Sequence, residues 1–340
     1  MGIMRCKPMI PGMAAVLSLA AVPVFAITLS LESVQDSVVG RLETALPEKG
    51  DTLLDVGRRN GMGYYDMKHV NPTIDTWLPA LDAEIIIPKS FVLPDSPKEG
   101  IVLNIPEMRL YYYPRAKGGI AAEVLTFPIG IGREGWNTPY MTTRIASKQA
   151  NPSWHPPESI RKEHAAEGDP LPKRVPPGPD NPLGAFAMRL GNPQYLLHGT
   201  NKPWGVGMRV SHGCIRMYPE DIEFMFRQVP VGTPVRIVNQ PYKVGRRGDR
   251  IYIEAHPALD EDQDHYDDNL TSVVRRIVAM TEEQSYQVDW ELARQVIRDG
   301  RGVPIEVGRF LVKSADADTR TAGNDRALDL RMETRVSDPR

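Results

Sequence analysis

The chain has 340 residues, a length typical of two or three domains with a sizeable core. Hydrophobic residues make up 41% of it, which indicates a soluble globular protein rather than a bundle of membrane helices. The formal net charge is only −2, and this near balance argues against nucleic acid as the main partner.

Residues 1–26 have the pattern of an export signal that is removed from the mature protein. Arg5 and Lys7 precede an apolar run over residues 9–24, and a small-x-Ala cleavage site ends at Ala26. A retained membrane anchor is the alternative, which the proline and the small residues near this site disfavour. We therefore expect export with cleavage after this alanine.

The two cysteines of the chain, Cys6 and Cys214, would be separated by this cleavage. Only Cys214 would remain, in a compartment where disulfides form. An unpaired thiol in an exported protein is either buried in the core or used in chemistry. Ser, His and Gly directly precede Cys214, and these are not typical core residues, which favours the chemical role.

Residues 43–90 are predicted to form a compact unit of two short helices between two strands. The turn at residues 49–52 precedes the first helix, and Asn71-Pro72 ends the second. Three isoleucines over residues 85–87 indicate a buried strand. This order and the Gly-Asp-Thr-Leu sequence at 50–53 resemble a LysM domain, which implies binding of peptidoglycan. A LysM-like fold that serves only as a packing partner is the alternative.

From residue 98 to residue 239 the pattern changes to short strands separated by Gly and Pro turns, as in an all-β sandwich or barrel. The predicted strands are 101–104, 108–113, 124–130, 142–148, 182–190 and 232–238.

The segment 151–182 interrupts these strands with nine prolines and almost no aliphatic periodicity. A Pro-rich segment of this length within a domain is typical of a functional lid or a disordered insert. We expect a lid over the site that follows it in the sequence. Two of its histidines, His155 and His164, are interpreted as surface residues.

Residues 195–217 carry one thiol and two imidazoles within seventeen residues, on His198, His212 and Cys214. An apolar strand is predicted to end at His198, and a second strand leads into the Ser-His-Gly-Cys sequence. A histidine close to a cysteine can take its proton or stabilise its thiolate, so the stretch predicts a nucleophile and a base. Three zinc ligands are the alternative, although no fourth residue or known ligand spacing accompanies them.

The order His198, twelve further residues and then Ser211-His212-Gly213-Cys214-Ile215-Arg216 resembles the motif of the L,D-transpeptidases, the YkuD-type cysteine enzymes of bacterial cell walls. The resemblance covers residues 98–239 and implies a YkuD-type β-sandwich or barrel. It implies that Cys214 is the nucleophile and His198 the general base, with no metal or cofactor. The N–H groups of Gly213 and Cys214 would stabilise the oxyanion.

Further residues of the stretch are expected to assist. His212 is interpreted as holding the loop, since a residue two before the nucleophile does not easily face its sulfur. Ser211 is expected to bond the local backbone or to orient a histidine. Arg216 is expected to bind a substrate carboxylate and to lower the pKa of the cysteine, with a surface ion pair as the alternative. The other predicted substrate-binding residues are Thr200 and Trp204.

Residues 240–308 are predicted to form a small α/β domain, and residues 309–340 a disordered polar tail. The acidic run 259–269 resembles a calcium loop but lacks its central glycine, so a solvated loop is expected. A strand is predicted over 250–255 and an amphipathic helix over 288–298.

The resemblance implies a periplasmic enzyme that acts on tetrapeptide stems of peptidoglycan through a cysteine thioester, and that carbapenems acylate. The thioester passes either to a second stem, which gives a 3→3 cross-link, or to the C-terminal lysine of an outer-membrane lipoprotein. The architecture, with a LysM-like unit before the catalytic domain and a small domain after it, resembles the lipoprotein-attaching enzymes. A hydrolase of the same bonds and a non-catalytic wall-binding protein are the alternatives.

Overall fold

The computed structural model describes residues 27–31, 33, 35–115, 123–266, 270–281 and 285–311. The predicted signal segment and residues 312–340 of the predicted tail lie outside these residues, so both remain predictions. No helix in the described part of the chain is long and apolar enough to cross a membrane.

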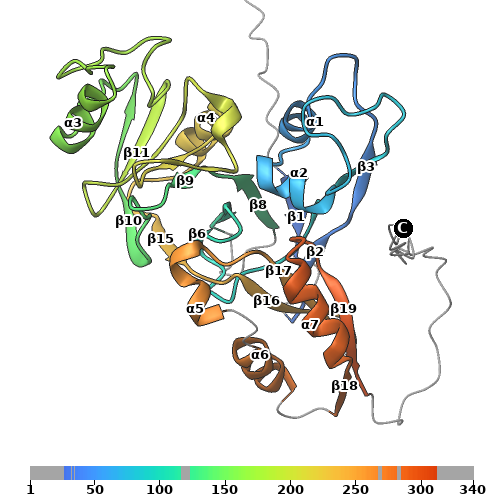
Figure 1. Ribbon diagram of the computed structural model, residues 1–340. Helices are drawn as coiled ribbons and strands as arrows, with labels where there is room; N and C mark the ends of the chain where they lie inside the picture. Colours follow the sequence, from blue (N-terminus) through green and yellow to red (C-terminus); the bar gives the residue numbers. More distant parts are fainter. Residues whose placement is uncertain are drawn as a thin grey trace, which may run out of the picture.

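The centre of the molecule is a nine-stranded sheet with the order β1-β8-β7-β6-β15-β10-β11-β12-β14 (Figure 1). Neighbouring strands are antiparallel, except that β15 is parallel to β6 and β12 to β14. A bridge between Gly130 and Arg216 joins the chain after β8 to β14, which brings one end of the sheet back toward the other. The mainly β fold of the catalytic domain, a sandwich or barrel, is therefore confirmed. The strands are β1 (Ile27–Ser30), β6 (Gly100–Asn104), β7 (Arg109–Tyr113), β8 (Glu123–Pro128), β10 (Met141–Ala150), β11 (Phe186–Leu190), β12 (Leu196–His198), β14 (Ile215–Arg216) and β15 (Pro234–Val238).

Strands β6 and β7 are buried on both faces because their alternate residues enter two different cores. Leu103 and Leu110 pack in the core of the catalytic domain, together with residues of helix α4 (Pro219–Gln228). Val102 and Tyr111 pack in a second core with residues of the N-terminal unit. Successive side chains of a strand point to opposite faces, so both strands need apolar residues at nearly every position.

The N-terminal unit contains helices α1 (Leu53–Arg59) and α2 (Tyr64–Val70) between the paired strands β3 (Glu43–Ala45) and β4 (Ile85–Ile87). Thr52 starts α1 with a capping box, in which its side chain and that of Asp55 bond each other's backbone N–H. Strand β2 (Val38–Gly40), which precedes the predicted start at residue 43, pairs with β5 (Ser90–Val92), which continues past the predicted end at residue 90. Glycan binding by this unit remains a prediction.

The N-terminal unit contacts the segment before Ser211 and the helix α4 after Arg216. Arg58 forms a bidentate pair with Glu220 of α4, at N–O distances of 2.9 and 3.0 Å. The N–H of Tyr64 donates to the carbonyl oxygen of Val206 at 3.2 Å. Gly207 has a φ of +79°, and a Cβ there would lie 2.3 Å from the nitrogen of Tyr64, so this close approach requires glycine. The unit therefore packs directly against the catalytic domain.

The C-terminal domain is a four-stranded antiparallel sheet with the order β16-β17-β19-β18, seen in orange and red in Figure 1. Strand β19 continues to Phe310, which is buried and pairs with Tyr286, so it passes the predicted start of the tail at residue 309 by two residues. The predicted acidic loop begins with a 3-10 turn, η2 (Asp260–Asp262). The other elements are α5 (Gln263–Tyr266), α6 (Thr271–Thr281), α7 (Trp290–Asp299), β16 (Tyr242–Arg247), β17 (Arg250–Ala255), β18 (Tyr286–Val288) and β19 (Ile305–Phe310).

Candidate active site

Two adjacent parallel strands carry the histidine and the cysteine of the motif, and their register places Cys214 beside Leu196, two residues before His198 on the neighbouring strand. His198 is the last residue of β12, and it pairs in register with Arg216 of β14. Cys214 directly precedes β14. The chain reaches Cys214 through β13 (Arg209–Ser211), a short strand that pairs only with β9 (Ile131–Gly132) among the described strands.

The loop from Ser211 to Cys214 is held by hydrogen bonds to its own backbone. The Ser211 hydroxyl donates to the carbonyl oxygen of Cys214 at 2.6 Å and accepts from the N–H of Gly213 at 3.2 Å. The hydroxyl of Thr138 donates to the carbonyl oxygen of Gly213 at 3.0 Å. Gly213 has a φ of +96°, which a residue with a side chain rarely adopts. Ser211 and Gly213 thus set the shape of the turn before the cysteine.

The thiol of Cys214 is half-buried, and its sulfur lies 3.7 Å from the carbonyl oxygen of Gln194. Burial raises the pKa of this thiol, and a backbone hydrogen bond from Leu196 and the charge of Arg189 only partly oppose that effect. The sequence suggested a lowered pKa through pairing with histidine or arginine. In the structure the neutral thiol is instead the resting form, because desolvation outweighs the nearby charge.

His198 is buried and neutral. Burial and the charge of Arg216 lower its pKa to about 4, although a hydrogen bond to Gly199 opposes them. Its Nδ1 lies 2.6 Å from the carbonyl oxygen of Gly199, which can only accept, so Nδ1 carries the proton and Nε2 is left as an acceptor. In the described part of the chain no hydrogen bond joins this ring to Cys214. Such contacts often tighten only when substrate is bound.

His212 is engaged by the Pro-rich segment rather than by the thiol. Its Nε2 lies 3.1 Å from a carboxylate oxygen of Glu163 and 3.2 Å from a guanidinium nitrogen of Arg133. The rings of Trp136 and His212 pack in a T-shaped arrangement, with the centroids 4.9 Å apart. Burial lowers the pKa of His212, which the hydrogen bond to Glu163 partly offsets. These contacts are those of a histidine that holds a loop.

Glu163 belongs to a helix that the sequence did not predict, α3 (Glu158–Ala166), inside the Pro-rich segment. The helix buries only Ile160, so its apolar pattern is too sparse to be recognised in the sequence. The two histidines of the segment differ in their surroundings. His155 is exposed, whereas the ring of His164 lies 6.5 Å from that of His212.

The three predicted substrate-binding residues have different surroundings. The guanidinium of Arg216 lies over Gly205, where a Cβ would be 2.7 Å from Nη1, and its Nε has no hydrogen-bond partner among the described residues. The alternative of a surface ion pair therefore finds no support in the described part of the chain. Thr200 is buried and its hydroxyl accepts from the N–H of Lys202 at 2.9 Å. Trp204 is 61% exposed.

A buried cluster of Glu107, Glu254 and His256 is the one group of described residues whose ligand atoms lie close enough to hold a metal ion. The Nζ of Lys243 lies 2.8 Å from a carboxylate oxygen of each glutamate and supplies the compensating positive charge. Glu254 of the cluster also accepts a hydrogen bond from the N–H of Val92. The cluster therefore joins the N-terminal unit, the catalytic domain and the C-terminal domain. The residues of the cysteine motif form no such group within the described ranges, and the zinc alternative finds no support in their geometry.

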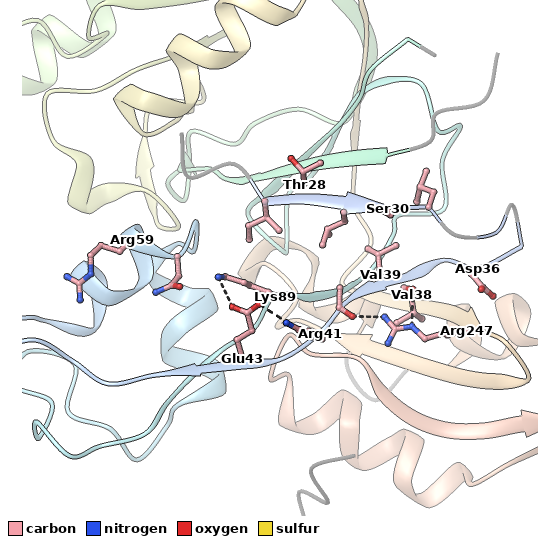
Figure 2. A pocket seen from close by; sticks show the side chains of 15 residues that line it. Thr28, Ser30, Asp36, Val38, Val39, Arg41, Glu43, Arg59, Lys89 and Arg247 are labelled. Carbon is pink, nitrogen blue, oxygen red and sulfur yellow. Dashed lines mark hydrogen bonds and ion pairs between the residues drawn. The ribbon is translucent and has the colours of Figure 1, made fainter. Parts of the chain in front are cut away.

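A cavity of about 650 Å³ lies beside β1 and β2, away from the cysteine motif, and none of the motif residues lines it (Figure 2). Two of the cationic side chains that line it are bonded to protein oxygens. The Nζ of Lys89 lies 2.8 Å from Glu43, and Arg247 donates to the carbonyl oxygens of Val38 and Gly40. We assign no part of the chemistry to this cavity.

Comparisons with known proteins agree with the motif. Residues 98–237 match the YkuD family, the L,D-transpeptidase catalytic domain. The probable L,D-transpeptidase YcfS of Escherichia coli strain K12 is 39% identical over 299 residues, which cover 86% of this chain and 92% of that protein. YbiS of the same strain is 38% identical over 292 residues, covering 83% and 92% of the two chains. ErfK/SrfK of Salmonella typhimurium strain LT2 is 39% identical over 274 residues, which cover 78% of this chain and 86% of that protein. The chain therefore belongs to the L,D-transpeptidase family and is an enzyme with a YkuD-type catalytic domain.

Proposed function

We propose that this enzyme acts in the periplasm on tetrapeptide stems of peptidoglycan and attaches an outer-membrane lipoprotein to them through a thioester on Cys214. The observation that carries the proposal is the pair of adjacent strands that present Cys214 and a neutral His198. A neutral imidazole with a free Nε2 can accept a proton from a neutral thiol, so both groups rest in the form that the reaction needs.

In the first step, the thiol sulfur attacks the carbonyl carbon of diaminopimelate, the third residue of the stem. A carbon–sulfur bond forms, and the carbon–nitrogen bond to the terminal D-alanine breaks. Nε2 of His198 takes the proton from the thiol and passes it to the departing amine. The hydrogen bond from Nδ1 to Gly199 holds the ring in the required tautomer throughout.

In the second step, the amine of a C-terminal lysine attacks the thioester, an amide forms, and the thiol recovers its proton. A diaminopimelate amine in the same place would give a 3→3 cross-link. The N–H of Gly213 is bonded to Ser211, so its predicted role toward the oxyanion requires that this bond be released. Arg216, which is half-buried without an ion-pair partner in the described part of the chain, is suited to the carboxylate of the stem, and the exposed Trp204 is suited to its aliphatic part.

Product analysis tests this proposal and its alternatives. Sacculi that contain diaminopimelate are incubated with the purified protein and a peptide that ends in lysine, then digested and analysed by mass spectrometry. We expect conjugates of the peptide with stems that have lost one D-alanine, and none with a peptide whose lysine side-chain amine is acetylated. Cross-linked dimers alone would identify the other acceptor, and tripeptide stems alone would identify a hydrolase. Unchanged sacculi would contradict the proposed activity.

We also propose that the Pro-rich segment 151–182 acts as a lid, which Glu163 holds down through Arg133 and His212. Glu163→Gln should raise KM by about two- to fivefold, since a partly exposed ion pair contributes at most about 1 kcal/mol. Glu158→Gln is the matched control on the same helix, because it breaks only the exposed pair with Lys162. Equal KM values for the two variants would contradict the lid.

A further inference from the structure

Three consecutive acidic residues of the C-terminal domain contact the catalytic domain. We name Asp260, Glu261 and Asp262 the acidic clamp. They form the turn η2, in the run that the sequence had suggested to be a solvated loop. Each of the three carboxylates contacts a residue of the catalytic domain, and the contacts lie on two sides of the cysteine loop.

The first contact is with the strand that leads into the cysteine loop. Nη2 of Arg209 lies 3.0 Å from both carboxylate oxygens of Glu261, and Nη1 lies 3.4 Å from Asp260. The side chains of Arg209 and Glu261 are only 16% and 25% exposed, so solvent screens this pair less than an ordinary surface pair. Arg209 starts β13, which has only the short strand β9 beside it among the described strands. The clamp therefore adds an ion pair to a strand that is otherwise held by hydrogen bonds to the chain around β9.

The second contact is with the chain that supports the loop from the other side. Asp262 accepts from the hydroxyl of Tyr140 at 2.5 Å and from the side-chain amide of Asn239 at 2.9 Å. Tyr140 lies two residues after Thr138, whose hydroxyl donates to the carbonyl oxygen of Gly213. The same hydroxyl accepts the N–H of Gly132 in β9. One turn of the C-terminal domain thus reaches both segments that fix the loop.

We propose that the C-terminal domain positions the cysteine loop of this enzyme, and that the acidic clamp is the part of the domain that does so. The inference rests on the proposed function in that it assigns the loop to catalysis. The clamp residues do not touch the reacting atoms, so they are positioning residues. A displacement of about 1 Å of a reacting group can slow a reaction by about 10², so even partial loosening of the loop is measurable.

The test compares Glu261→Gln, Asp262→Asn and the double variant with the native protein. We expect acylation of Cys214 by a carbapenem to slow about tenfold in the double variant. The carbapenem concentration that gives half the maximal rate should stay unchanged, and the melting temperature should fall by less than about 3 °C. Glu306→Gln is the matched control in the same domain, since Glu306 pairs with Arg250 at 2.6 Å and touches neither segment of the loop. It should acylate at the native rate.

Two further measurements make the test specific: reversal of the charges of Arg209 and Glu261, and hydrogen exchange of backbone amides. Arg209→Glu alone should slow acylation, and the combination with Glu261→Arg should restore part of the rate, which a general loss of stability would not do. Backbone amides of residues 209–214 should exchange faster in the clamp variants and at the native rate in Glu306→Gln.

The outcomes separate this inference from the proposed function. Native acylation and native exchange in the double variant would overturn the clamp while leaving the proposed function intact. A native protein that forms no adduct on Cys214 would contradict the proposed function. Hydrogen exchange would still decide in that case, since unchanged exchange in the variants would overturn the clamp as well.

Discussion

Replacement of Cys214 by serine is expected to abolish the carbapenem adduct and to lower transpeptidation by at least about 10³-fold. A hydroxyl ionises far less readily than a thiol, and the surroundings of Cys214 do little to compensate. His198, with a pKa of about 4, is a weak base. A backbone hydrogen bond from Leu196 and the charge of Arg189 only partly offset burial of the sulfur. A site of this kind suits a polarisable sulfur nucleophile and leaves an oxygen nucleophile inactive.

Intact-mass spectrometry after incubation with an excess of carbapenem measures the adduct directly. Cys6→Ser in the full chain is the matched control, because it removes the other cysteine and leaves the site as it is. That variant should gain one adduct per chain at the native rate. An adduct on Cys214→Ser protein, or its loss in Cys6→Ser protein, would show that the nucleophile is wrongly assigned.

Elements with a strong local pattern could be predicted from the sequence. The strand predicted over 250–255 is β17, and the helix predicted over 288–298 corresponds to α7 within two residues. α7 places one apolar face on the C-terminal sheet and starts with the side chain of Asp289 as its N-cap. In contrast, β1 was not predicted, because its four residues gain their stability from pairing with β8, far along the chain.

The site could be predicted only as far as one continuous stretch of sequence contains it. His198 and Cys214 fall on adjacent strands because the segment between them is a short crossover, so their proximity is encoded locally. Glu163 and Arg133, which engage His212, lie 49 and 79 residues away from it. Asp260 and Glu261 of the acidic clamp lie 51 and 52 residues from Arg209, in a run whose composition alone favours solvent. Contacts of this range depend on the tertiary fold and leave no periodic signal.

The pKa of the thiol could not be predicted from neighbours in the sequence either. Two histidines and an arginine near Cys214 suggested a stabilised thiolate. In the structure His198 is itself buried and neutral, and His212 is engaged by Glu163. His198 then supplies no positive charge to the sulfur, and His212 contacts Glu163 instead of the thiol. Of the two roles expected for a histidine near the thiol, removal of its proton and stabilisation of its thiolate, the raised pKa of the thiol favours the first.

Replacement of His198 by alanine should slow acylation of Cys214 by at least about 10², the usual scale for loss of a general base. The dependence on pH should change as well. His198 has a lowered pKa of about 4, so the base form is present above that pH and is lost only as the pH falls through it. Because the thiol pKa is raised, the native rate should stay nearly constant from about pH 5 to pH 8.

Without the imidazole, the reaction would depend on the small fraction of free thiolate. The rate in the His198→Ala protein should therefore rise about tenfold for each unit of pH over the same range, because the thiolate fraction does so below the thiol pKa. Rates of adduct formation timed by intact mass across this range measure both profiles. His155→Ala, which changes an exposed histidine of the Pro-rich segment, is the control and should keep the native profile. A rate in the His198→Ala protein that equals the native rate and does not change with pH would assign the base to another residue. The next variant to measure would then be His212→Ala, since His212 is the other imidazole next to the cysteine loop.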